Sequence, residues 1–402
     1  MTCNVAVLNR LGVALATDSA VSSLRHDESG EVVTKVFWGS RKLFRLRPDL
    51  PVGILLHGST DLMGRPWESL IGTFRSTLPA RGFPALVDYA RAFFRHVESD
   101  PALFPDTLQR RDFRLTCEAY VKGFLLHGLE EELDEPAADD PEAARQALGR
   151  ILKRDLEEWK RVPELEGLGE PYGQALWRHY GREIHPFWAE ILGFRPSRSL
   201  VAGLDRLARH LYSRQWISPE DISGIVFAGF GEKEFFPAIA EYWLGTLALG
   251  RLRVIQRTSV AVSDENAALL FPFGQTEAID AFFRGITPKL MENLGAAVRE
   301  ACPPGAAESL LEEFRKTIEQ TQIEPLMCLI SSMPCSELVR LAEMLVNLAV
   351  FGAHLSPHLE TVGGPLELAL LNRETAFTWV RRNRPTGIDS DLQTTPDNRR
   401  FS

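Results

Sequence analysis

The stretch Thr2-Cys3-Asn4-Val5-Ala6-Val7, together with Leu11-Gly12-Val13-Ala14-Leu15-Ala16-Thr17-Asp18-Ser19, decides the fold that we expect. Apolar residues alternate along both segments, and a tight turn at Gly12 between them predicts a β-hairpin that closes in an acidic residue. A small residue after Met1 normally allows the initiator methionine to be removed. We therefore expect Thr2 to carry a free α-amine beside its hydroxyl. This pairing places a nucleophile and a base on one residue.

The composition restricts the class of protein. The chain has 402 residues, of which 45% are apolar, so it can hold one large domain or two ordinary ones. Its net charge of −9 argues against nucleic-acid binding. We see no apolar run of about 18 residues and no signal-peptide pattern, so we expect no membrane span. The five cysteines are odd in number and scattered, which suits reduced thiols in a cytoplasm.

Four features in chain order resemble the proteasome β-subunit family and its bacterial relatives, which are N-terminal-nucleophile (Ntn) hydrolases. They are Thr2, an aspartate 16 positions later at Asp18, a lysine-bearing segment at 41–46, and an apolar strand at 52–57 that ends in Gly58-Ser59-Thr60. The end of the chain adds to the resemblance. There, Gly363-Gly364 precedes two short strands, as in the family's last turn and hairpin.

The resemblance implies an α+β fold, a four-layer helix–sheet–sheet–helix Ntn-hydrolase sandwich with large helical insertions. Strand-like and helix-like patterns divide the chain accordingly. We expect the core at 1–99, 216–286 and 336–382, with helical insertions at 100–215 and 287–335. The polar tail at 383–402 is expected to be disordered.

The resemblance also assigns roles at the amino terminus. Thr2 is the nucleophile, and Asp18 holds Lys42 and orients Thr2. The Lys42 ammonium also lowers the pKa of the α-amine, which favours the basic form. The backbone N–H of Gly58 stabilises the oxyanion, because a glycine lets the backbone approach the scissile carbonyl. His57, Ser59 and Thr60 are candidates for lining a substrate pocket.

Two of these residues have competitors, and a further family residue is missing. Lys35 is closer than Lys42 to the family position when counted from Thr2, whereas the distance to Gly58 favours Lys42. Cys3 is intrinsically the better nucleophile, but the spacing to Asp18 favours Thr2. A serine that supports the terminal amine in the family is replaced by Phe273 here.

A second supporting pair is only half present. If the alignment holds near the end of the chain, its acid survives as Glu360 and its hydroxyl is lost at Gly363. Either other polar groups hold the amine, or the site is weak or inactive.

No cofactor or metal is expected. His179 and His185 lie six residues apart without a carboxylate partner on the same helix face, which does not suit zinc. Gly229 and Gly231 lack the rest of a dinucleotide fingerprint, and no phosphate-loop lysine follows Gly53 to Gly58.

These observations lead to one main hypothesis and two alternatives. The main hypothesis is a cytoplasmic threonine-type hydrolase that cleaves peptide or amide bonds through an acyl-enzyme at Thr2. The alternatives are a catalytically inactive Ntn-fold scaffold or binding subunit, which the missing serine favours, and a small-amide acylase. We expect a homo-oligomer, with an ATPase or another protein as a candidate partner and with no nucleic acid or membrane.

Overall fold

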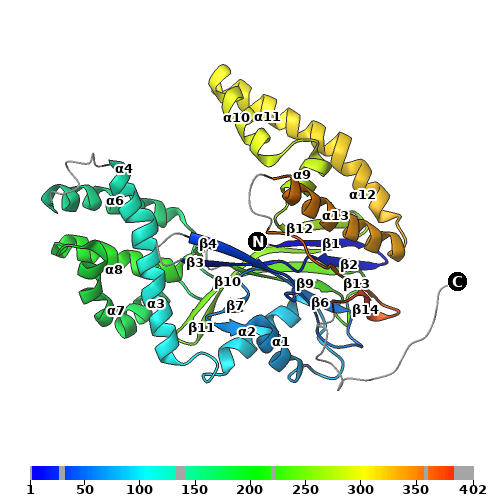
Figure 1. Ribbon diagram of the computed structural model, residues 1–402, viewed down its shortest axis with the longest axis horizontal. Helices are drawn as coiled ribbons and strands as arrows, with labels where there is room; N and C mark the ends of the chain where they lie inside the picture. Colours follow the sequence, from blue (N-terminus) through cyan, green and yellow to red (C-terminus); the bar gives the residue numbers. More distant parts are fainter. Residues whose placement is uncertain (1, 27–31, 133–140, 219–221, 357–360, 384–402) are drawn as a thin grey trace.

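The computed structural model describes residues 2–26, 32–132, 141–218, 222–356 and 361–383, and its centre is a pair of five-stranded antiparallel sheets (Figure 1). Sheet I has the strand order β12-β1-β2-β13-β14, and sheet II has the order β11-β10-β9-β6-β5. The strands of sheet I are β1 (Cys3–Asn9), β2 (Gly12–Thr17), β12 (Ala268–Gly274), β13 (Glu367–Asn372) and β14 (Ala376–Arg381). The strands of sheet II are β5 (Leu43–Arg45), β6 (Val52–Gly58), β9 (Ser223–Gly229), β10 (Ala238–Ala248) and β11 (Arg251–Ala261).

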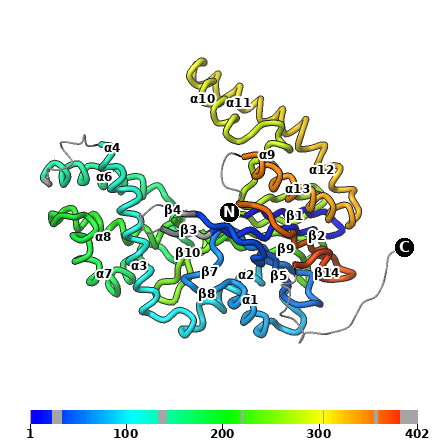
Figure 2. The backbone as a smooth tube through the Cα atoms, viewed as in Figure 1, coloured from blue at the N-terminus to red at the C-terminus, as the bar shows by residue number. Residues whose placement is uncertain are grey.

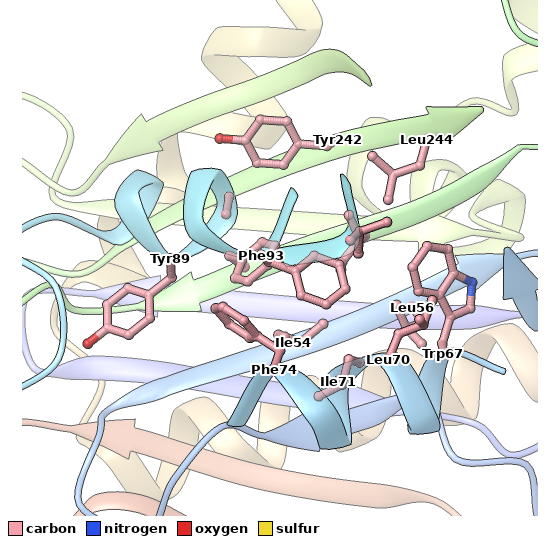
Figure 3. Packing of buried hydrophobic residues seen from close by; sticks show 14 of the residues in the cluster. Ile54, Leu56, Trp67, Leu70, Ile71, Phe74, Tyr89, Phe93, Tyr242 and Leu244 are labelled. Atoms are coloured by element: carbon pink, nitrogen blue, oxygen red, sulfur yellow. The ribbon is translucent and has the colours of Figure 1, made fainter. Parts of the chain in front are cut away.

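Helices cover the outer faces of both sheets. Apolar residues from the two sheets, such as Leu15 and Leu55, pack against each other in the middle. Helices α9 (Glu277–Arg284) and α13 (Cys335–Leu355) cover the outer face of sheet I. Helices α1 (Trp67–Arg75) and α2 (Leu86–Ser99) cover sheet II, where Trp67 and Phe93 fill the layer (Figure 3). The fold is therefore α+β, with mixed helices and antiparallel sheets in four layers.

The first hairpin is buried on both faces. Every residue of β1 and β2 is buried, which explains why apolar residues run through both strands rather than alternating with charges. The turn lies at Arg10 and Leu11, and Gly12 is already the first residue of β2. A Cβ at Gly12 would lie 2.6 Å from the Leu371 carbonyl oxygen. The glycine thus allows β13 to approach, a role different from the turn role that we expected.

The helices that follow α2 form a lobe with its own hydrophobic core. The lobe consists of α3 (Asp106–Tyr120), the π-helical turn η1 (Val121–Leu126), α4 (His127–Glu132), α6 (Pro141–Arg161), α7 (Glu170–Leu192) and α8 (Arg198–Ser213). Its core contains large aromatic residues, among them Phe113, Trp159 and Trp188. The buried Arg253 on β11 donates to the Leu211 carbonyl and lies over the Tyr212 ring, which fastens α8 to sheet II.

The second helical segment projects as an arm (Figure 2). It contains α10 (Pro288–Ala301), α11 (Pro304–Ile318), the π-helical turn η2 (Glu319–Ile323) and α12 (Glu324–Ser331). Among the described residues of α10 only Gly295 is buried, and Leu290 is 56% exposed. The arm therefore has much less core of its own than the lobe has.

Helix α13 corrects one expectation. In the part of the chain that the structure describes, it alone has the length and composition that could cross a membrane, with a mean hydropathy of 1.5 over its best window. The sequence was expected to hold no such apolar run. Leu338, Leu345 and Val346 are buried against sheet I, and a core helix meets the same criteria of length and composition.

The remaining elements are short. Strands β3 (Val21–His26) and β4 (Val32–Phe37) pair only with each other, and β7 (Asp61–Leu62) pairs with β8 (Arg65–Pro66). Nearly all of the predicted tail, from residue 384 on, lies outside the described residues.

Candidate functional site

Asp18 and Lys42 form a buried ion pair at the amino-terminal end of β1. Lys42 Nζ lies 2.6 Å from Asp18 Oδ1, and their side chains are 6% and 0% exposed. Burial lowers the pKa of Lys42 below its usual value, and the adjacent Asp18 carboxylate works against that shift. The pair brings together residues 24 positions apart, because Lys42 directly precedes β5 and Asp18 directly follows β2.

Backbone donors fix the Asp18 carboxylate. The Cys3 N–H donates to Oδ1 at 3.0 Å. The N–H groups of Gly363 and Ala20 donate to Oδ2 at 3.0 and 3.2 Å. With the Lys42 ammonium, four donors satisfy this carboxylate, as a buried charge requires. Asp18 therefore connects the start of β1, the lysine and the Gly363-Gly364 turn.

Thr2 lies at this corner and is 6% exposed. Its carbonyl oxygen accepts the Gln275 N–H at 2.7 Å, and the peptide N–H that follows it is the Cys3 donor to Asp18. Side chains alternate between the faces of a strand. Thr2 thus shares a face with Asn4 and Ala6, the face toward sheet II. Thr2 is held by backbone bonds beside the ion pair.

Cys3 faces the opposite way. It packs in the layer between sheet I and α13 and is fully buried. Burial, with a further contribution from the Asp18 charge, raises the pKa of its thiol to about 12. The thiolate is the nucleophilic form of cysteine. Cys3 therefore stays a protonated core residue at neutral pH.

A buried hydrogen-bond network joins the two sheets next to the ion pair. Thr17 Oγ1 donates to Asn4 Oδ1 at 2.6 Å, and Asn4 Nδ2 donates to the Leu56 carbonyl at 2.8 Å. The Leu56 N–H in turn donates to the Lys42 carbonyl at 2.9 Å. These bonds fix the position of the Lys42 backbone relative to β1.

Gly58 ends β6 on the same side of the molecule. Its φ is +82°, and a Cβ there would lie 2.1 Å from the Ile222 carbonyl oxygen, so only glycine fits. The Ser59 N–H donates to Ile222, so the Gly58 N–H points to the opposite edge of β6, where Leu56 meets Lys42. Strand β5 pairs with β6 only from Leu43 onward. The Gly58 N–H thus points past the start of β5.

His57, a predicted pocket residue, is held by groups from three other strands. Its ring stacks on Phe273 of β12, with centroids 5.7 Å apart and planes at 15°. His57 Nε2 lies 3.1 Å from Glu241 Oε1 on β10. A Cβ at Gly224 of β9 would lie 2.0 Å from the His57 ring, so that glycine makes room for it.

The other predicted residues lie at different places. Ser59 Oγ donates to the Asp61 carbonyl at 2.9 Å within a turn, and Thr60 is exposed. Lys35 is exposed on β4, with Nζ 5.1 Å from the centroid of the Phe37 ring, so the cation bound to Asp18 is Lys42. Glu360 lies outside the described residues.

One polar pair near Thr2 was not predicted from the sequence. Thr361 Oγ1 donates to Gln275 Oε1 at 3.3 Å, and Gln275 also holds the Thr2 carbonyl through its backbone N–H. Thr361 is 4% exposed. The sequence pointed to its neighbour Glu360 as the supporting acid. The one sign of Thr361 in the sequence is that it is a polar residue directly before Val362-Gly363.

Within the described part of the chain, no group of three or more His, Cys, Asp or Glu residues could hold a metal ion.

Comparisons with known proteins add little to this geometry. No family model matches the chain, and no curated protein matches it. Among solved structures, the chain is similar to the Anbu (Gly-1) mutant from Hyphomicrobium sp. strain MC1, with a TM-score of 0.30 and 11% sequence identity. That alignment covers 97% of this chain and 89% of the other. A likeness this weak carries no argument about fold or function.

Proposed function

We propose that this protein is a proteasome-like Ntn hydrolase that cleaves peptide or amide bonds with Thr2 as its nucleophile. The observation that carries the proposal is the buried Asp18–Lys42 pair, which is hydrogen-bonded to the peptide directly after Thr2. Buried ion pairs contribute little net stability, and buried charged groups with a specific charge partner cluster at functional sites. The pair lies at the start of β1, and the Lys42 carbonyl accepts the Leu56 N–H, two residues before Gly58.

The proposed reaction uses the two groups of Thr2 together. Its Oγ attacks the substrate carbonyl carbon while its α-amine takes the hydroxyl proton. The Gly58 N–H, which points past β5, donates to the oxygen that gains negative charge. Collapse of this intermediate breaks the C–N bond, and the protonated α-amine returns the proton to the leaving amine. An ester of Thr2 remains.

Water completes the cycle. The α-amine takes a proton from water as the water oxygen attacks the ester carbonyl. Loss of the Thr2 oxygen then releases the carboxylic acid and restores the hydroxyl. Lys42 supports both halves electrostatically, because a nearby cation favours the neutral, basic form of the amine. Gln275 and Thr361 are the polar groups that would position Thr2 in place of the missing serine.

A second candidate is a subunit that retains the fold without catalysis. Phe273 favours it, because this aromatic ring occupies the position expected for a supporting serine and stacks on His57 instead. In that case the ion pair serves only to anchor the start of β1. The assembly expectations also remain proposals: a homo-oligomer, and an ATPase or other protein partner.

The test of the main proposal begins with the native amino terminus. Intact-mass measurement should find Thr2 as the first residue, because any residue before it blocks the amine. Thr2→Ala should then abolish hydrolysis of a broad panel of peptide and amide substrates, while Thr2→Ser retains part of it.

Circular dichroism and thermal unfolding provide the control that Thr2→Ala folds normally. Equal turnover by the native protein and Thr2→Ala would show that Thr2 is not the nucleophile. Absence of turnover in a native protein that begins at Thr2 would favour the non-catalytic subunit.

A further inference from the structure

The starting point is the face of β10 that does not pack on α1 and α2. Tyr242 and Leu244 point into the layer of those helices (Figure 3). Because side chains alternate along a strand, Glu241 and Trp243 point to the other face of sheet II. This is the face that carries His57 and, across the sandwich, Phe273.

Glu241 is fixed by two donors. Its Oε1 lies 3.1 Å from His57 Nε2 and accepts the Trp243 indole N–H at 3.2 Å. The His57 and Glu241 side chains are 10% and 14% exposed. This oxygen is already engaged within the protein, so the main effect of Glu241 is to hold the His57 and Trp243 rings in place.

A β-bulge brings an arginine beside Trp243. Glu241 pairs with Thr258, whereas the next residue of β10, Tyr242, pairs with Gln256. Arg257 is therefore the extra residue on β11. Bulges redirect a side chain, and they are over-represented near active sites. Here the Arg257 guanidinium carbon lies 4.1 Å from the centroid of the Trp243 ring.

Arg257 is the accessible charge next to Trp243. It is exposed, and no carboxylate of the described residues forms an ion pair with it. A guanidinium stacked on an indole is held in one plane, which leaves its N–H groups directed at an external acceptor. Carboxylates are the acceptors that match this planar fork.

The strand pairing also gives the approximate distance between His57 on β6 and Arg257 on β11. His57, Gly224, Trp243 and Ile255 are paired neighbours on β6, β9, β10 and β11. Three steps between strands of about 4.8 Å each separate β6 from β11 by about 14 Å, which is about four residues of an extended peptide. His57 directly precedes Gly58, the proposed oxyanion donor.

We propose that Arg257 recognises a carboxylate of an extended peptide substrate, about four residues away from the bond that Thr2 cleaves. This inference rests on the proposed function and names its substrate class as acidic peptides rather than small amides. Trp243 and Glu241 are positioning residues for Arg257, and Gly224 makes room for the His57 ring that Glu241 holds.

The experiment separates recognition from cleavage. Acetylated twelve-residue peptides carry one Glu at each position in turn, with Gln as the matched neutral residue and Lys as the opposite charge. Binding is measured by isothermal titration calorimetry to the Thr2→Ala protein, which leaves peptides intact, and cleavage sites of the native protein are mapped by mass spectrometry.

We expect Glu at one position to bind on the order of tenfold more tightly than Gln, as for a charge-assisted contact. Arg257→Met should remove this preference, and Arg257→Lys should keep only part of it. Trp243→Phe, which keeps a ring but loses the donor to Glu241, should weaken it. The control Arg340→Met, an exposed arginine on α13, should leave it unchanged.

The outcomes are distinguishable. If no position prefers Glu, or if Lys is preferred instead, the inference is wrong whether or not peptides are cleaved. If the preference persists in Arg257→Met, another cation is responsible and the inference is also wrong. If Glu is preferred in binding but nothing is cleaved, the proposed hydrolysis fails while the recognition site stands.

Discussion

Two buried carboxylates lie next to each other at one end of sheet I and differ in almost every other respect. Asp18 is fully buried and accepts from the Lys42 ammonium and three backbone N–H groups. Glu367 is 2% exposed and pairs with Thr17, the residue before Asp18, yet its Oε2 has no hydrogen-bond partner among the described residues. Burial raises the pKa of Glu367 to about 7, although Arg41, Arg382 and backbone N–H groups oppose that shift. The contrast teaches that depth alone does not determine charge. The donors around each carboxylate do.

The largest effect should come from Asp18→Asn. The amide group cannot neutralise Lys42, and its Nδ2 would meet a backbone N–H, so a buried ammonium is left unpaired. We expect the free energy of unfolding to fall by about 3–5 kcal/mol, measured by urea denaturation at pH 7. Asp264→Asn, on a side chain that is 89% exposed and paired with Arg10, is the control and should change it by less than about 0.5 kcal/mol. Equal effects at the two positions would remove the distinction between them.

Glu367→Gln should act in the opposite direction. The folded-state pKa of about 7 lies above the usual value of 4.5, so the folded protein holds the proton longer than the unfolded chain does. Stability should therefore fall as the pH rises from about 4.5 through 7. The difference of about 2.5 pKa units, at 1.36 kcal/mol each, corresponds to about 3 kcal/mol. Glutamine at this position should remove that loss, seen as a flatter pH dependence of unfolding. An unchanged pH profile would mean that Glu367 titrates normally.

Thr17→Val should have a smaller effect. The substitution keeps the shape but removes the donor to Asn4 Oδ1, which is then buried without that partner. We expect a loss of about 1–3 kcal/mol in the free energy of unfolding, measured by the same denaturation. Thr17→Ser, which retains the hydroxyl, is the matched control. No loss in Thr17→Val would show that this network does not hold the corner together.

Assembly is the least specific prediction. Exposed apolar residues on the arm and α13, such as Leu290 and Phe351, suit burial against another copy. Light scattering on purified protein should therefore find more than a monomer at micromolar concentration. A stable monomer would show that the arm is exposed to solvent and does not contact another copy of the chain.

Local pattern was enough for the first hairpin and for the strands around it. The apolar character of β1 and β2 and the spacing from Thr2 to Asp18 are local properties of the sequence, and the ion pair uses Lys42, the lysine that the spacing to Gly58 favoured. The sequence pattern did not predict strand β10, although it is an interior strand of sheet II, between β11 and β9. Its sequence mixes alanine, glycine and a glutamate, and only pairing with β9 and β11 makes it a strand.

The missed contacts at the site share one physical reason. Glu241 reaches His57 from 184 positions away, and Thr361 reaches Gln275 from 86 positions away. Neither pair leaves a periodic signal, because each depends on how distant strands meet rather than on local conformation. The Phe273 departure was visible in the sequence, but its stacking on His57 was not.

The bonds that hold the start of β1 have a consequence for the order of events in the cell. They use the Thr2 carbonyl, the Cys3 N–H and the Cys3 carbonyl, and none of these three groups is the α-amine. The sandwich can therefore assemble while other residues still precede Thr2. In the hydrolase that we propose, removal of what precedes Thr2 is then a separate, later event, and the folded precursor has no activity until it occurs.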